Sequence, residues 1–264
     1  MSVGNGRMNY TAIGTLTTTG GAAIPRNAPI LLTTQDWSMQ VDVHVDPFAI
    51  ASQGQFADVF LGFGKTGDWF NTHVTFEFDR GWWHSGFWDI GDDVRINGVD
   101  APGLFHLSNL TSADAALRMD YSAANHTITY YFDADGAAYG YNWVAQGTTN
   151  LTSGTYNLNL SATDTFTIFL LGSSGYQNVA AGQAYLSNLV ITVTAPPRLT
   201  LIHSGANVVL TWPTNAAEFT LQYTTNLAPP AVWTTVSPTP VVANTNNAVT
   251  NAISGTRRFY RLSQ

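Results

Sequence analysis

Hydrophobic and polar residues alternate in several short segments of the chain. Residues 38–46 (SMQVDVHVD) place a methionine and three valines on one side and polar residues on the other, and residues 74–78 (VTFEF) repeat this pattern. A period of two predicts half-buried β-strands, because successive side chains of a strand point to opposite faces. Residues 56–63 (FADVFLGF) are nearly all apolar, which predicts a strand that is buried on both faces.

Further segments with this pattern are separated by turn residues. We expect residues 116–121 and 127–133 to pair as a hairpin, and Asn97-Gly98 to close a second turn. The remaining strands are expected at 10–18, 94–96, 139–144, 155–160, 165–171 and 185–193. No segment predicts a helix longer than one turn. Many short strands with regular turns predict an all-β antiparallel sandwich or jelly roll.

The sequence Ala195-Pro196-Pro197 interrupts this pattern, since consecutive prolines cannot continue a ladder of backbone hydrogen bonds. We therefore expect two domains, residues 1–195 and residues 196–264. The expected strands of the second domain are 198–201, 207–212, 218–224, 232–236, 248–250 and 257–262. Short strands at this density suit a small immunoglobulin-like sandwich.

Composition narrows the classes of function. Only 10% of the 264 residues are charged, against the usual quarter or so, and the net charge of −7 argues against nucleic acid, which needs a basic surface. No apolar run approaches the roughly 20 residues of a membrane span, and no signal segment stands at the N-terminus. The absence of cysteine excludes disulfides and thiolate chemistry. The many uncharged polar residues favour an extracellular or cell-surface location.

Residues 71–89 (NTHVTFEFDRGWWHSGFWD) carry the richest candidate chemistry. The polar face of the strand within this segment presents His73, Glu77 and Asp79 in a row. Two carboxyl groups on one strand face suit acid–base or nucleophilic attack on a glycosidic bond. The alternative is a solvated outer strand face without a catalytic role.

An aromatic segment follows this strand and contains Trp82, Trp83, His84 and Trp88 beside two glycines. The glycines predict a loop, and exposed aromatic rings often mark a binding site, because the C–H face of a sugar stacks on an indole. Adjacent tryptophans on an extended segment point oppositely, so only one of Trp82 and Trp83 can face a given groove. We expect these residues to bind sugar; the alternative is that they fill the core under the loop. Further aromatic candidates are Trp69, Tyr141 and Trp143.

A second candidate site combines His44 and His73, from strands that we expect to be neighbours in one sheet. Arg118, Asp120 and Tyr131 are expected to join that face. Such a set suits a β-elimination lyase, in which the arginine neutralises a uronate while tyrosine or histidine moves the proton. If the chain is an enzyme, its catalytic candidates are Glu77, Asp79, His44 and His73.

Asp133 and Asp135 lie in an oxygen-rich turn (DADG) that could hold a structural calcium ion. The turn lacks the remaining ligands of an EF-hand loop, so the alternative is an ordinary hairpin turn. No other cofactor is indicated by the sequence.

The pattern of residues 36–43, 117–136, 166–172 and 185–191 is similar to that of a known fold. Over roughly residues 8–194, the chain resembles the concanavalin A-like lectins and glucanases, the laminin-G-like group in particular. The resemblance implies two antiparallel sheets, with glycan recognition or cleavage on a concave face. Family-16 glucanases of this fold carry Glu-x-Asp-x-Glu on one strand. Here Thr75 or Gly81 replaces one of these carboxylates, which puts a family-16 mechanism in doubt.

Residues 209–213 (VLTWP), 219–222 (FTLQ) and 259–262 (FYRL), with Trp233, are similar to another known module. They resemble a short immunoglobulin-like module at the C-termini of secreted proteins of Verrucomicrobia-type bacteria. The resemblance implies a spacer or attachment domain, with no activity of its own.

The leading hypothesis is extracellular polysaccharide binding through the concave face and the tryptophan-rich loop of the first domain. The first alternative is a glycoside hydrolase or polysaccharide lyase that acts on the same face. The second alternative is a structural or adhesive surface protein whose tryptophan-rich loop is buried against a partner chain.

Overall fold

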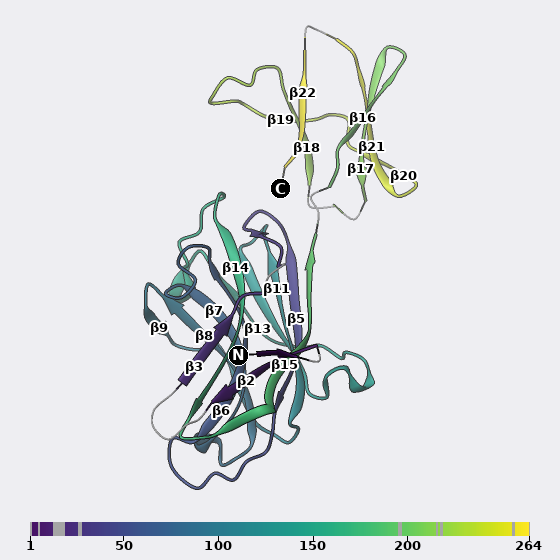
Figure 1. Ribbon diagram of the computed structural model, residues 1–264. Helices are drawn as coiled ribbons and strands as arrows, with labels where there is room; N and C mark the ends of the chain where they lie inside the picture. Colours follow the sequence, from purple (N-terminus) through teal and green to yellow (C-terminus); the bar gives the residue numbers. More distant parts are fainter. Residues whose placement is uncertain are drawn as a thin grey trace. The chain divides into compact units, whose positions relative to one another are not determined.

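The chain folds into two compact units, residues 1–194 and residues 195–264 (Figure 1). This computed structural model describes residues 2–4, 6–12, 19–25, 28–194, 197–214, 216, 219–254 and 257–263. Each unit contains a hydrophobic core of its own. The strand pairs found among these residues are antiparallel.

The first unit is a sandwich of two sheets, A and B. In its described residues, sheet A has the strand order β1 (Ser2–Gly4), β2 (Arg7–Ala12), β15 (Val179–Val193), β5 (Trp37–Val45), β11 (Asp114–Ser122), β12 (Thr127–Asp133) and β13 (Val144–Asn150). Sheet B has the order β10 (His106–Leu110), β8 (Trp88–Ile96), β7 (His73–Gly81), β6 (Phe56–Lys65), β14 (Thr165–Gly175) and β3 (Thr19–Ala23), while β4 (Leu31–Leu32) pairs with β14 and β9 (Val99–Ala101) with β8. The described helical segments are the 3-10 turns Trp82–His84, Gly136–Tyr139 and Gly154–Tyr156. The predicted all-β antiparallel sandwich is confirmed.

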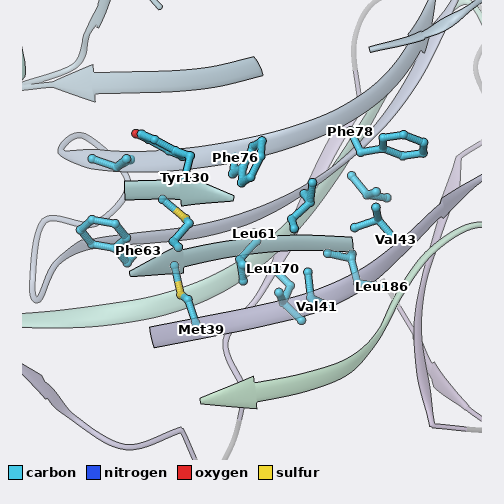
Figure 2. Packing of buried hydrophobic residues seen from close by; sticks show 14 of the residues in the cluster. Met39, Val41, Val43, Leu61, Phe63, Phe76, Phe78, Tyr130, Leu170 and Leu186 are labelled. Carbon is cyan, nitrogen blue, oxygen red and sulfur yellow. The ribbon is translucent and has the colours of Figure 1, made fainter. Parts of the chain in front are cut away.

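The core lies between the two sheets and follows the predicted alternation. Every second residue of β5 is buried, and β6 is buried on both faces over most of its length, as its apolar sequence predicts. Figure 2 shows Met39 and Val41 of sheet A with Leu61 and Phe76 of sheet B in this core. These side chains are fully or almost fully buried.

Two predicted turns are also confirmed. Strands β11 and β12 pair as one hairpin, from Ala116 opposite Asp133 to Ser122 opposite Thr127. Strands β8 and β9 pair across Asn97-Gly98, where both residues have positive φ angles, as a tight hairpin turn requires.

Two segments predicted as strands form other structure. Of residues 139–144, Tyr139 ends a 3-10 turn, Val144 begins β13 and residues 140–143 lie in a loop, because the Asp133 carboxylate accepts the backbone N–H of Asn142 and Tyr141 donates its hydroxyl to Asp42 at 3.0 Å. Residues 155–160 contain part of a 3-10 turn and Asn159 with φ 51°, which interrupts an extended chain. Part of the strand predicted at 10–18 lies outside the described residues, namely 13–18.

The second unit consists of two smaller sheets. In the described residues these are β16 (Thr200–Ser204), β17 (Asn207–Pro213), β21 (Asn246–Ala252) and β20 (Val241–Ala243) in one sheet, and β19 (Thr234–Thr235), β18 (Thr220–Thr224) and β22 (Phe259–Ser263) in the other. Leu210, Trp212, Leu221 and Val249 form its core. The immunoglobulin-like classification of this unit stays a prediction. None of the helical segments described in either unit is long and apolar enough to cross a membrane.

Candidate functional site

The face of sheet B that points away from the core carries a group of acidic residues. Along β7, Val74, Phe76 and Phe78 are buried in the core, so Glu77 and Asp79 project from the opposite face. Directly opposite residues of antiparallel strands point to the same side. The pairing of β6, β7 and β8 therefore brings further acidic residues beside Glu77 and Asp79. The added residues are Asp58, which lies opposite Asp79, and Asp89 and Asp93 on β8.

Asp58, Asp79 and Asp89 form one row across the three strands, and each is almost fully buried. Asp58 accepts hydrogen bonds from the Ser173 backbone N–H at 2.7 Å and the Ser173 hydroxyl at 3.0 Å. Asp89 lies 2.8 Å from the Nε2 atom of His106. Burial raises the pKa of Asp58 and that of Asp89 to about 7 each. Burial, assisted by the charge of Glu77, raises the pKa of Asp79 to about 9.

Glu77 lies next to this row and is half-buried between Phe60 of β6 and Gly91 of β8. A Cβ atom at Gly91 would lie 3.1 Å from the Glu77 Oε1 atom, so the glycine provides the space that this carboxyl occupies. Burial, followed by the charges of Asp58 and Asp93, raises the pKa of Glu77 to about 8. Among the described residues the Glu77 carboxyl has no hydrogen-bond partner. It therefore remains available to a ligand on this face.

Trp83 covers one end of the acidic row. It follows β7 in a 3-10 turn, and a Cβ atom at Gly81 would lie 2.9 Å from its ring, so the ring lies directly over that glycine. Its side chain hydrogen-bonds the Asp79 carboxyl, and its ring centroid is 5.1 Å from that of Phe56. With 48% of its surface exposed, Trp83 offers a flat apolar surface beside the carboxyl groups.

The other residues of the aromatic segment have different positions. Trp82 is also exposed, at 43%. Trp88 is buried in the core, where its Nε1 atom donates to the Val45 carbonyl at 2.8 Å, so its prediction as a binding residue is wrong. Trp88 lies an even number of residues from Ile90 and Val94 along β8, so its side chain points to the same core-facing side as theirs. The side chain of His84 lies outside the part of the chain that the structure describes.

A second aromatic cluster lies at the other end of β7. Trp69 packs over Gly64, where a Cβ atom would lie 2.7 Å from the Trp69 Cα atom. The His73 Nδ1 atom lies 2.9 Å from the Trp69 carbonyl oxygen. Phe169 of β14 is 5.0 Å from the Trp69 ring and covers the sheet over Gly62. Trp69 and Phe169 therefore give this end of the face an aromatic surface.

The predicted pairing of His44 with His73 is wrong. His44 belongs to β5 of sheet A, whereas His73 belongs to β7 of sheet B. The two side chains therefore project from opposite sides of the sandwich. The prediction failed because strand alternation determines which face of its own sheet a residue lies on, but not to which sheet the strand belongs. Both ring nitrogens of His44 lie 2.8 Å from carboxylates, those of Asp46 and Asp114.

The remaining residues of the predicted lyase site do lie on the outer face of sheet A, which also carries His44. Arg118 donates two hydrogen bonds to Asp120, at 2.7 and 2.9 Å, and its guanidinium carbon is 5.8 Å from the centre of the Tyr131 ring. The Arg118 charge is thus largely balanced within the protein. The structure does not assemble these residues with Glu77, Asp79 or His73.

The predicted calcium turn is held by its own hydrogen bonds. The Asp133 carboxylate accepts the backbone N–H of Asp135 at 3.1 Å and that of Asn142. Among the residues that the structure describes, no group of three or more His, Cys, Asp or Glu side chains is placed to hold a metal ion.

Sequence reasoning missed three acidic residues of the site, Asp58, Asp89 and Asp93. Asp58 gave one signal, because it is the only charged residue in the otherwise apolar segment 56–63, and a buried carboxyl needs hydrogen-bonding partners. Asp89 and Asp93 gave none, since their place on this face depends on the pairing register of β7 and β8.

No protein-family model matches the chain, and a search of the curated proteins finds no match. Some solved structures have a partly similar arrangement. One is lectin II from Ulex europaeus, with 15% identity and a TM-score of 0.45, where the match covers 72% of this chain and 87% of the lectin. Another is the potassium-bound carbohydrate recognition domain of Emp46p, with 10% identity and a TM-score of 0.45, where the match covers 73% of this chain and 84% of that chain. A third is the CBM2 module of the evolved Dit of Lactobacillus casei BL23 phage J-1, with 10% identity and a TM-score of 0.44, where the match covers 72% of this chain and 77% of that chain.

Proposed function

We propose that the protein binds polysaccharide through the outer face of sheet B, outside the cell or on its surface. The observation that supports this most is the exposed Trp83 ring, which lies on that face beside the Asp79 carboxyl. An indole stacks on the C–H face of a sugar, and neighbouring carboxyl groups bond its hydroxyls. The uncharged polar composition supports the location. The second unit would then serve as a spacer or attachment module.

Electrophoresis through gels that contain a polysaccharide tests this proposal. Laminarin, xyloglucan, galactomannan and hydroxyethyl cellulose form a suitable set. We expect at least one of them to retard the wild-type protein. Trp83→Ala should weaken that retention roughly tenfold, because losing about 1.4 kcal/mol of aromatic contact corresponds to this factor.

The matched control is Tyr139→Ala. Tyr139 is an exposed aromatic residue, at 84%, and it lines a cavity together with residues of sheet A. This variant should be retarded like the wild type. Equal retention of all three proteins would contradict the proposed face, and passage of the wild type through every gel without retardation would contradict polysaccharide binding itself.

Hydrolysis of the bound polysaccharide is a second candidate function, which the carboxyl groups favour. Glu77 and Asp79, with pKa values of about 8 and 9, keep their protons at neutral pH and could protonate a leaving oxygen. Asp58, with a pKa of about 7, is partly ionised at the same pH and could assist as a base or nucleophile. The three groups lie on one face of two neighbouring strands.

The release of new reducing ends from a retained polysaccharide distinguishes this candidate from binding alone. If Glu77 is catalytic, Glu77→Gln should abolish the release and leave retention within about twofold, because the amide keeps the shape of the side chain but cannot donate a carboxyl proton. Retention of the wild type with no new reducing ends around neutral pH would rule out hydrolysis. Unsaturated products would instead indicate a lyase.

A further inference from the structure

An aromatic cluster lies at each end of β7 on the outer face of sheet B. Trp83 is placed over Gly81 at the C-terminal end of the strand. Trp69 lies just before the N-terminal end, and the neighbouring Phe70 packs edge-on against it, 6.1 Å away, with 69% of its surface exposed. The nine residues of β7 separate the clusters by roughly 27 Å at the usual rise per residue. A single sugar is too short to contact both.

The surface between the two clusters is acidic. Within the described residues of β6, β7 and β8, no lysine or arginine projects from this face between the clusters. Arg95 lies at its margin, opposite His73, and is paired with Asp100 at 3.1 Å. The acidic side chains that project there are Asp58, Glu77, Asp79, Asp89 and Asp93. A chain of uronates or sulfated sugars placed here would meet like charges at close range, which is unfavourable.

We propose that this face binds the interior of an uncharged polysaccharide chain, extended along β7 from Trp83 to Trp69 and Phe70, and that it rejects polyanionic chains. The inference rests on the proposed function and specifies its ligand. The two clusters supply stacking surfaces, and between them the half-buried Glu77 and Asp93 hydrogen-bond sugar hydroxyls. Specificity then comes from repulsion of the wrong ligand as much as from contact with the right one.

The charge preference is tested with a matched pair of ligands. The neutral polysaccharide that retards the wild type is compared with a carboxymethylated form of the same backbone, in gels of equal mass concentration at pH 8. We expect retention to fall at least tenfold on the modified polymer. Glu77, with a pKa of about 8, is partly ionised at this pH, so Glu77→Gln removes negative charge from the face and should reduce the difference between the two polymers.

The extended position of the ligand is tested by chain length. Oligosaccharides from the retained polysaccharide compete for the protein, and an octasaccharide should compete at least tenfold better than a disaccharide. If the disaccharide binds at Trp83, Phe70→Ala should weaken competition by the octasaccharide and leave competition by the disaccharide unchanged. Phe70 is a suitable position because it is exposed, and Tyr139→Ala again provides the control.

The possible failures are distinct. Equal retention on the neutral and the carboxymethylated polymer, or equal competition by short and long oligosaccharides, would overturn this inference and leave polysaccharide binding intact. Loss of retention on every neutral polysaccharide would overturn the proposed function and this inference with it.

Discussion

Asp79 shows how a single residue of the site affects stability. Its side chain is almost fully buried, and burial with the neighbouring Glu77 raises its pKa to about 9, from an ordinary value of 3.8. The folded state thus keeps a proton that the unfolded state releases above about pH 4. The stability that depends on this proton is complete below pH 4 and is lost as the pH rises towards 9.

We therefore predict that Asp79→Asn stabilises the protein at pH 8 but not at pH 4. Asparagine needs no proton in order to be buried neutral, so the gain at pH 8 should be at least about 1.4 kcal/mol, the equivalent of one pKa unit. Denaturant unfolding at the two pH values measures it. The same difference in unfolding free energy between variant and wild type at pH 4 and pH 8 would show that stability does not depend on the Asp79 proton.

At the scale of elements, Trp88 connects the two sheets of the first unit. It lies on β8 of sheet B, and its indole donates to the carbonyl of Val45 at the end of β5 in sheet A. Trp88→Phe removes this donor and leaves a buried carbonyl without it, which costs about 1–3 kcal/mol. We expect a corresponding loss in the free energy of unfolding, while retention on polysaccharide is unchanged. Trp83→Ala, in contrast, should weaken retention, and it should also lower the free energy of unfolding because it removes the hydrogen bond to the buried Asp79 carboxyl.

The sequence predicted the strands whose residues alternate most regularly. Alternation located β5 and β7, and the apolar run located β6, because burial of one or both faces determines these patterns. It failed at residues 139–144, where the side chains of Asp133 and Asp42 hold a loop in place of a ladder. Hydrogen bonds between residues far apart in the chain leave no local pattern.

The candidate site was predictable only in part for the same reason. Glu77 and Asp79 were predicted to share one face, since both lie on one strand. Asp58 and Asp89 join them through the pairing of three strands, which no local period encodes. The prediction that His44 and His73 meet failed because the strand order of a sheet is likewise a property of the whole unit.

At the scale of the whole molecule, the face that we propose to bind polysaccharide belongs entirely to the first unit. Each unit has a core of its own, so we predict that a fragment of residues 1–194 folds and is retarded by polysaccharide like the full chain, within about twofold. Gel electrophoresis of the two proteins side by side measures this. A fragment that folds, as judged by cooperative unfolding, but is no longer retarded would assign part of the site to residues 195–264.

The most direct test of the central claim follows the indole N–H resonances of the full chain by NMR, while an oligosaccharide of the retained polysaccharide is added. The signal of Trp83, identified by its absence in Trp83→Phe, should shift progressively to saturation. That of Trp88, buried in the core, should stay in place. An unchanged Trp83 signal at saturation, or a shift confined to Trp233 of the second unit, would contradict binding on the outer face of sheet B.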